Sequence, residues 1–349
     1  MTKQSYTVGI YTLGCKVNQY ESEAIAEALT RGGICVQSPA LPCDAYIINT
    51  CTVTAESDRK ARQFIRRAIK QNPDAYIVVT GCLAQTSPAM LSAIERVDAV
   101  IGNTQKMAAA DTVFSLLKCG KKNIEPQILV EPIDSAPFEP MCITRFDRTR
   151  AYVKIEDGCE SRCTYCIIPS ARGSIRSKPE EEVLDEVRAL CQNGCREVVL
   201  TGIETASYGK DLHDTDLASL LEKVDAIPGI GRVRLGSLDP SLIRPEFVAR
   251  IAPLTSLAPH FHLSLQSGSS RVLALMKRKY NADQAMKAIT RLREALPNVK
   301  FTTDVIVGFP QETEEDFQQT VDFVRKARFL MVHVFPYSKR KGTPAATMS

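Results

Sequence analysis

The stretch AYVKIEDGCESRCTYC, residues 151–166, joins a short apolar run to three closely spaced cysteines. The run has the composition of a buried strand, and Cys159, Cys163 and Cys166 follow directly after it. Thiolates this close in sequence can meet at one metal centre if the loop wraps around it. Structural zinc sites prefer four closed ligands, so three cysteines favour a [4Fe–4S] cluster with one open iron. A zinc site with a distant fourth ligand, such as Cys142, is the alternative.

The sequence around this loop alternates strand-like and helix-like segments. The predicted strands are 152–155, 197–201, 232–236, 261–266, 301–307 and 331–335, and the main predicted helices are 179–193, 216–226, 283–295 and 314–327. Such alternation predicts parallel strands with crossover helices. Six units are too few to close an eight-stranded barrel. We therefore expect a partial, open (βα)6 barrel over residues 149–342.

An earlier alternation over residues 1–120 predicts a doubly wound parallel α/β domain. Its predicted strands are 6–13, 45–49, 75–80 and 98–102. We expect Asn18 to cap the first helix, with Glu21 completing a capping box, and Thr54 to cap the second helix. Residues 121–148 hold four prolines and no helical period, which is typical of a linker between domains.

A second cysteine triplet lies in this first half, with one cysteine shortly after each of three predicted strands. Cys15, Cys51 and Cys82 are far apart in sequence, but the carboxyl ends of parallel strands share one edge of a sheet, where ligands bind. We therefore predict a three-thiolate metal site at that edge. The alternative is that these are ordinary buried cysteines. The other six we interpret as structural: Cys35, Cys43, Cys119, Cys142, Cys191 and Cys195.

Composition narrows the class of protein. The 349 residues carry 44 Lys+Arg against 40 Asp+Glu, a net charge of +4, which excludes a histone-like or polybasic-tail protein but not RNA binding through local patches. No apolar run reaches the ~18 residues of a membrane helix, and the N-terminus lacks the apolar region of a signal peptide. These features predict a cytoplasmic protein, in which 12 cysteines favour metal binding over disulfides.

The cysteine loop, with Tyr165 before its last cysteine, resembles the radical S-adenosylmethionine (SAM) superfamily. The segments TLGCKVNQYE, INTCTVT, HFHLSLQSG, TTDVIVGFPQETEEDF and HVFPYSKRKGTP extend the resemblance to its methylthiotransferase family. The segment LGCKVNQYE resembles the branch that acts on N6-threonylcarbamoyladenosine at position 37 of tRNA. The resemblance implies an enzyme with two [4Fe–4S] clusters, one on each triplet, and with SAM as cofactor.

The resemblance also implies a reaction. One SAM methylates sulfur held at the N-terminal cluster, and a second SAM yields the radical that removes hydrogen from C2 of the adenine. The partners implied are tRNA, an electron donor and a sulfur source. The alternatives are methylthiolation of another tRNA adenosine or of a ribosomal-protein aspartate. A protein of another class, a non-catalytic iron–sulfur carrier or zinc protein, also stays open.

Individual contacts follow from the same resemblance and from strand-end positions. The residues expected around SAM are Tyr165, Gly202, Glu204, Ser237, Gln266, Ile306 and Gly308. Arg172 and Arg176 are expected to meet the threonyl carboxylate. Basic groups at 59–70, 277–279 and 339–341 are candidates for phosphate contacts, although a solvated surface explains them equally well.

The end of the sequence carries one more expectation. Family members usually continue past the FPYSKRKGTP segment into a small β-barrel that grips tRNA. We therefore interpret residues 343–349 as the start of a segment leading to an RNA-binding barrel that is absent from this sequence.

Overall fold

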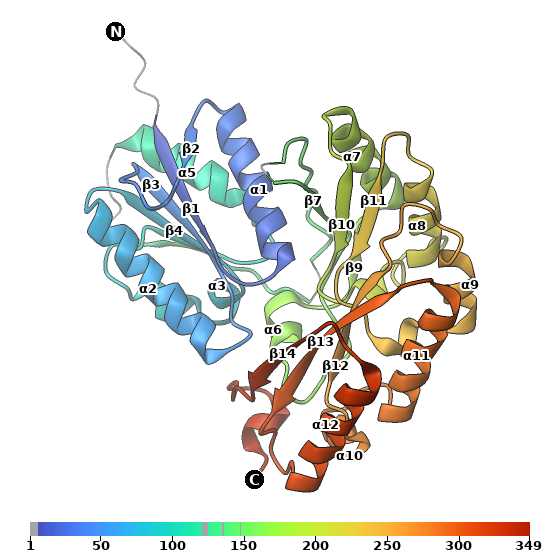
Figure 1. The fold of residues 1–349 in the computed structure, drawn as a ribbon. Coiled ribbons are helices and arrows are strands. Elements are labelled where there is room, and N and C mark those ends of the chain that lie inside the picture. Colours follow the sequence, from blue (N-terminus) through green and yellow to red (C-terminus); the bar gives the residue numbers. More distant parts are fainter. Residues whose placement is uncertain (1–5, 121–124, 135, 147) are drawn as a thin grey trace. The chain divides into compact units, whose positions relative to one another are not determined.

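The computed structural model of the chain describes residues 6–120, 125–134, 136–146 and 148–349. The parts of the predicted first domain and linker at 1–5, 121–124, 135 and 147 lie outside the described residues. The chain forms two compact units (Figure 1). The first unit comprises Met1–Arg145 and Ile168–Ser174, and the second comprises Phe146–Ile167 and Ile175–Ser349.

The first unit is built on a six-stranded parallel sheet with the order β2-β1-β3-β4-β5-β6. Its strands are β1 (Thr7–Thr12), β2 (Cys35–Gln37), β3 (Ala45–Thr50), β4 (Tyr76–Gly81), β5 (Ala99–Ile101) and β6 (Gln127–Leu129). Every residue of β3 and β4 is buried, as expected for central strands covered on both faces. The strand order reverses between β1 and β3, which makes this point of the sheet a topological switch point.

Helices cover both faces of this sheet, as Figure 1 shows. The helices of the unit are α1 (Lys16–Arg31), α2 (Ala55–Gln71), α3 (Cys82–Thr86), α4 (Pro88–Ser92), α5 (Ala108–Cys119) and α6 (Ile168–Arg172). One core lies between the sheet and α1 and α5, and the other between the sheet and α2, α3 and α4. The Thr54 side chain accepts a hydrogen bond from the Ser57 amide at the start of α2, which confirms that cap.

Two expectations for the first unit are wrong. The segment 127–129, expected in a linker, pairs with β5 as a sixth strand; it is a short, exposed edge strand, and such strands show little hydrophobic alternation. Helix α1 begins at Lys16, so Asn18 lies inside it and does not cap it. The Asn18 amide instead donates to the carbonyls of Leu13 and Thr50, 2.6 and 3.0 Å away.

The second unit contains two three-stranded parallel sheets, β11-β10-β7 and β12-β13-β14. Isolated parallel bridges from Val233 to Leu257 and from Leu238 to Leu263 join β11 to the β12 region. The strands are β7 (Ala151–Lys154), β10 (Glu197–Thr201), β11 (Arg232–Leu235), β12 (His260–Gln266), β13 (Lys300–Val307) and β14 (Met331–Pro336). This series confirms the predicted open barrel of six parallel strands. A small antiparallel pair, β8 (Glu156–Asp157) and β9 (Arg176–Ser177), lies beside it.

The helices of the second unit are α7 (Glu180–Gln192), α8 (Leu217–Asp225), α9 (Pro245–Ile251), α10 (Ser270–Leu275), α11 (Ala282–Ala295) and α12 (Glu314–Ala327). Short 3-10 turns follow as η1 (Thr205–Ser207), η2 (Pro240–Leu242) and η3 (Pro344–Thr347). Helices α11 and α12 begin with reciprocal capping boxes at Asn281 and Thr313. Because the six strands are parallel, the loops that follow them share the carboxyl edge of the barrel. Active sites form at this edge in barrels of this kind.

Candidate functional sites

The three cysteines of the first unit lie at the switch point of its sheet. Cys15 precedes α1 directly, Cys51 follows β3, and Cys82 begins α3 after β4. Strands β1, β3 and β4 are neighbours in register. The sheet therefore brings together three cysteines that the sequence separates by 36 and 31 residues, as predicted.

Two glycines allow the loops that carry these cysteines to approach closely. Gly14 has φ +95°, and a β-carbon there would lie 2.7 Å from Cβ and 2.9 Å from Sγ of Cys51. Gly81 has φ +101°, and its β-carbon would lie 2.3 Å from the Thr50 carbonyl oxygen. Both backbones need glycine for conformation and for space. The space around the Cys51 thiol is thus shaped by the absence of a side chain at Gly14.

The thiols of the first triplet influence one another's protonation. Burial raises the pKa of Cys51 to about 12, with smaller contributions from the neighbouring Cys82 and Cys15 thiols. A metal ligand must be a thiolate, so a cationic centre has to offset burial and mutual repulsion. An iron–sulfur core does this, and three thiolates leave one iron open. The donor set and the cradle at Gly14 therefore fit a [4Fe–4S] cluster.

A buried polar network adjoins Cys82. The Arg172 guanidinium donates through Nε to Cys82 Sγ at 3.4 Å and through Nη1 to Glu21 Oε1 at 2.6 Å. Its Nη2 donates to Asn18 Oδ1 at 2.6 Å. Lys106 forms a second ion pair with Glu21. Sequence reasoning missed this network; its signal was two polar residues, Asn18 and Glu21, three apart on the buried face of α1.

The two arginines expected at the substrate carboxylate are placed differently from each other. Arg172 is completely buried, and its guanidinium already binds Glu21, so we do not retain it as a substrate contact. Arg176 is 9% exposed and its Nη2 lies 3.7 Å from Asp157 Oδ2. The role of Arg176 stays a prediction.

The second triplet belongs to one loop after β7 and β8. The Cys166 amide donates to the Cys163 carbonyl at 3.0 Å, which closes a tight turn. Thr164 ties this turn to the barrel, because its amide donates to the Met276 carbonyl and its hydroxyl to the Leu275 carbonyl. The amide and the hydroxyl of Thr164 therefore both hold this loop to the barrel.

Two of the three cysteines in this loop contact charged side chains. The Cys159 thiol donates to Glu204 Oε2 at 3.0 Å, and Arg278 Nη1 donates to Cys163 Sγ at 3.1 Å. Burial and the Glu204 carboxylate raise the pKa of Cys159 to about 12. Burial alone would raise the pKa of Glu204, but hydrogen bonding from Cys159 and the Lys279 charge hold it below its ordinary value.

The other residues expected around SAM lie at the carboxyl ends of successive strands. Tyr165 and Ile306 pack into one apolar cluster with Phe309, whose ring meets Tyr165 edge-on at 6.4 Å. Gly202 lies against Glu156, where a β-carbon would come within 2.5 Å of the carboxylate. Of the remaining three, Ser237 lies two residues after β11, Gln266 (φ +71°) is the last residue of β12, and Gly308 (φ +70°) directly follows β13.

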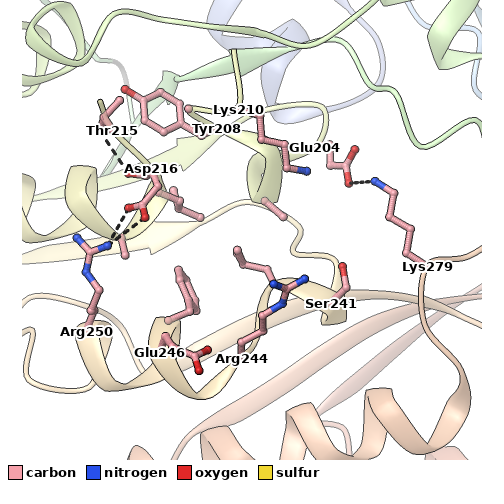
Figure 2. A pocket seen from close by; sticks show the side chains of 16 residues that line it. Glu204, Tyr208, Lys210, Thr215, Asp216, Ser241, Arg244, Glu246, Arg250 and Lys279 are labelled. Atoms are coloured by element: carbon pink, nitrogen blue, oxygen red, sulfur yellow. Dashed lines mark hydrogen bonds and ion pairs between the residues drawn. The ribbon is translucent and has the colours of Figure 1, made fainter. Parts of the chain in front are cut away.

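A cavity of about 730 Å³ opens beside Glu204, between the loops after β10 and β11 and helices α8 and α9 (Figure 2). Its volume is in the range of small-molecule sites. Glu204 and Lys279 pair across one end of it at 3.8 Å, and Arg250 and Asp216 pair at the other. Of the residues expected around SAM, Glu204 is the one in its lining.

Comparisons with known proteins show which family the chain resembles. The model of the radical SAM superfamily matches residues 153–324, and that of the uncharacterized protein family UPF0004 matches residues 7–102. The chain is 44% identical over 345 residues to the threonylcarbamoyladenosine tRNA methylthiotransferase MtaB of Bacillus subtilis, covering 98% of this chain and 76% of the relative. The Thermotoga maritima protein of the same name is 42% identical, at 98% and 77% coverage.

The chain belongs to the radical SAM methylthiotransferase family. A tRNA-2-methylthio-N6-dimethylallyladenosine synthase of Acetivibrio thermocellus is 35% identical, with 97% of this chain and 71% of the relative covered. Among solved structures, the radical SAM methyltransferase TsrM of Kitasatospora setae superposes with a TM-score of 0.69 and 15% identity, covering 98% of this chain and 74% of that one. That likeness confirms the fold.

Membership of the radical SAM superfamily implies SAM and a [4Fe–4S] cluster for this methylthiotransferase. The residues that would hold this cluster are Cys159, Cys163 and Cys166. Within the described parts of the chain, no helix is both long and apolar enough to cross a membrane.

One basic group of this methylthiotransferase departs from expectation. Arg278, expected among phosphate contacts, is mostly buried and pairs with Asp239 at 2.8 Å besides meeting Cys163. Lys279 pairs with Glu204. In the basic segment 277–279, the long Arg278 side chain is therefore directed toward the cysteine loop.

The second unit also holds a polar group that sequence reasoning missed. His262, Asp304 and His333 lie on neighbouring strands β12, β13 and β14, with ligand atoms all within 4.8 Å of one another. His262 Nε2 lies 3.2 Å from Asp304 Oδ2, and its Nδ1 meets Thr302 Oγ1 at 2.9 Å. Two imidazoles and a carboxylate can hold a divalent metal. Only the register of three strands brings these residues together.

Proposed function

We propose that this chain is a radical SAM enzyme that inserts a methylthio group at C2 of N6-threonylcarbamoyladenosine at position 37 of tRNA. The observation that supports this most strongly is the presence of two three-thiol sites in a chain that is 38–44% identical, over nearly its whole length, to enzymes named for that nucleoside. Each site leaves one iron of a [4Fe–4S] cluster open for a further ligand.

The second cluster belongs to this proposal. Cys15, Cys51 and Cys82 would hold it at the switch point of the first sheet. When both are bound, one cluster supplies the electron that cleaves SAM and the other supplies a place for the sulfur to be transferred. The protein's part is to keep three thiolates at each site and to leave the fourth position open.

Residues around the second triplet would orient SAM. Glu204 lies beside Cys159 and lines the cavity, so its carboxylate is suited to accept hydrogen bonds from the SAM ammonium group. Tyr165 and Ile306 offer an apolar surface for the adenine. Gly202 keeps the backbone close to Glu156, whose carboxylate accepts from the Glu204 amide at 2.8 Å, and so fixes the Glu204 loop.

The remaining expected contacts, Ser237, Gln266 and Gly308, would lie on the same side of the barrel. Arg176 is the remaining candidate for the threonyl carboxylate. The reaction also requires an electron donor and a sulfur source, and the proposal includes that it takes place in the cytoplasm, where tRNA is found.

The test is to reconstitute the chain anaerobically and supply SAM, dithionite, sulfide and tRNA. We expect 2-methylthio-N6-threonylcarbamoyladenosine in the digested nucleosides, measured by mass spectrometry. A charged hydrogen bond to the threonyl group is worth ~1.5–3 kcal/mol, so tRNA lacking that group should react at least about tenfold more slowly in kcat/KM. Equal rates on dimethylallyladenosine tRNA, or product only on a ribosomal-protein aspartate, would overturn the substrate assignment.

A further inference from the structure

Three neighbouring strands of the second unit bring two histidines and an aspartate together. His262 lies on β12, Asp304 on β13 and His333 on β14. In the register of the sheet His333 is paired with Asp304, and His262 is paired with Thr302, two residues before Asp304. Residues two apart on a strand point to the same face of the sheet. The three side chains therefore gather on one face, and their ligand atoms all lie within 4.8 Å of one another.

The distances within this group suit a metal ion. Zinc binds imidazole nitrogen and carboxylate oxygen at about 2.0–2.2 Å, so two ligand atoms on one ion lie about 3.0–3.5 Å apart. His262 Nε2 and Asp304 Oδ2 are already 3.2 Å apart. His333 is exposed on the edge strand β14, so its ring can rotate to shorten the other two distances. The exposed position also leaves room for water as a further ligand of the ion.

Thr302 holds the His262 ring in the orientation that this site needs. The Thr302 hydroxyl lies 2.9 Å from His262 Nδ1 and 3.3 Å from His260 Nε2. When Nδ1 of His262 carries the ring proton and donates a hydrogen bond to Thr302, the lone pair of Nε2 is available to bind the ion beside Asp304. Metal-binding histidines are commonly fixed in this way by a hydrogen bond from their other ring nitrogen. Thr302 is buried, and its hydroxyl is therefore held in place.

The group lies on the face of β13 that also carries Ile306. Thr302, Asp304 and Ile306 alternate along the strand, and Ile306 packs with Tyr165 of the cysteine loop. Two residues advance a strand by about 7 Å, so an ion at Asp304 would lie one such step before Ile306. The group itself contains no cysteine, and it is thus separate from both triplets.

We propose that His262, Asp304 and His333 bind one divalent transition-metal ion, with water completing its coordination. Two imidazoles and one carboxylate favour ions such as Zn²⁺ or Fe²⁺ over Mg²⁺ and Ca²⁺, which prefer oxygen ligands. The ion would tie the edge strand β14 to β12 and β13. This site goes beyond the proposed function, because it needs neither cysteine triplet.

The rival explanation is that His262 and Asp304 form an ordinary ion pair. His333 would then only pack against the His262 ring, whose centroid lies 6.0 Å from its own. The two explanations differ in the part that His333 plays, because an ion pair does not need it and a three-ligand site does. They differ in Thr302 as well, since its hydrogen bond to His262 would support metal affinity only if a metal is bound.

The experiment is equilibrium dialysis of the full chain against Zn²⁺ in the absence of oxygen, with bound zinc measured by atomic emission. Both cysteine triplets stay intact in every variant, so that zinc bound by thiols contributes equally and cancels in the comparison. The variants are His333→Ala, Asp304→Asn and Thr302→Val, each made separately. His213→Ala is the matched control, because it removes an exposed imidazole of the same unit that lies outside the group.

We expect the unaltered chain and His213→Ala to bind one more zinc ion than His333→Ala or Asp304→Asn. Loss of a residue that supports a metal ligand costs about tenfold to hundredfold in metal affinity. Thr302→Val should therefore weaken the binding of this ion by that factor, and the two ligand variants should weaken it further. Equal zinc content in the unaltered chain, His333→Ala and Asp304→Asn would overturn the inference. So would an equal loss in His213→Ala, because exposed imidazoles in general would then bind the zinc.

Circular dichroism shows whether each variant is folded, and if one ligand variant does not fold, the other decides by the same zinc difference. Co²⁺ then identifies the ligands. The spectrum of the unaltered chain minus that of His333→Ala should show cobalt d–d bands without strong thiolate-to-cobalt absorption. Thiolate absorption in this difference would place the ion on cysteines and overturn the inference. A chain that fails to form iron–sulfur clusters would overturn the proposed function and leave the zinc result unaffected.

Discussion

The two cysteine triplets differ in how the chain assembles them. Cys159, Cys163 and Cys166 lie on one loop that hydrogen bonds from Thr164 hold to the barrel. Cys15, Cys51 and Cys82 come from three loops, and the strand order of the sheet brings them together. The barrel triplet therefore depends on the local structure of one loop, whereas the sheet-edge triplet depends on every strand and loop that forms that edge of the sheet.

Their charged surroundings differ as well. The barrel triplet has one carboxylate and one cation against its sulfurs, Glu204 at Cys159 and Arg278 at Cys163. The triplet at the sheet edge has a cation at Cys82, with a second cation behind it. Under the proposed function, the barrel triplet would bind a zwitterionic cofactor and the sheet-edge triplet an anionic cluster, and the charged side chains beside each triplet suit that difference.

The largest expected effect separates the two triplets completely. Cys163→Ala should abolish 5′-deoxyadenosine formation from SAM, because the cluster that cleaves SAM loses a ligand. Cys51→Ala should retain that cleavage and abolish methylthio transfer. Chromatography with mass spectrometry measures both products in one reaction. Cys195→Ala and Cys43→Ala remove buried thiols from the same two units and should retain both activities; loss of SAM cleavage in Cys51→Ala would show that the sites are not independent.

The second expectation concerns metal content. Two cubane clusters require about eight irons and eight sulfides per chain. Changing Cys15, Cys51 and Cys82 together to Ala should halve both values, and so should changing the barrel triplet. Colorimetric iron and sulfide assays on anaerobically reconstituted protein provide the measurement. Four irons in the unaltered chain, or zinc in place of iron, would show that the chain does not hold two [4Fe–4S] clusters.

Gly14→Ala tests the dependence of the first triplet on its sheet edge. The new β-carbon would lie only 2.7 Å from Cβ of Cys51, and alanine would have to adopt the unfavourable φ of +95° that Gly14 has. We expect loss of the first cluster, seen as about half the iron, with SAM cleavage intact. Gly120→Ala is the matched control, because Gly120 also has positive φ (+62°) but no atom within 4 Å of its β-carbon. Both changes should lower stability by roughly 1–2 kcal/mol, yet only Gly14→Ala should lose iron.

The smallest expected effect concerns Glu204. Glu204→Gln removes the charge beside Cys159 and should raise KM for SAM about tenfold, the value of a charged hydrogen bond, with a smaller change in kcat. Initial rates of 5′-deoxyadenosine formation against SAM concentration give both constants. Glu246→Gln, in the same cavity lining, should leave KM unchanged. A purely structural role for Glu204 would instead lower kcat and the unfolding midpoint together.

The regular elements were predictable because their signals are local. Strand β10 spans Glu197–Thr201 as expected, and helix α12 spans Glu314–Ala327, since a run of apolar residues or a capping residue marks each one. The loop triplet was predictable for the same reason, as three cysteines in one loop need no knowledge of the fold.

What could not be predicted depends on long-range contacts. Asn18 and Glu21 fit a capping pattern on paper, yet Glu21 pairs with residues 85 and 151 positions away in the sequence. Arg278 lies in a basic segment expected to contact phosphate, yet its guanidinium donates a hydrogen bond to Cys163. In each case a polar side chain follows a partner that becomes its neighbour only after the sheet has formed.

The seven residues 168–174 have a consequence for the order in which the chain folds. They belong to the first unit but follow twenty-two residues of the second. A fragment ending at residue 145 would lack Arg172 and therefore the Arg172–Glu21 ion pair. During synthesis the N-terminal unit can therefore form this buried ion pair only after the ribosome has released the cysteine loop of the barrel. Maturation of the first half of the protein is thus timed by translation of the second.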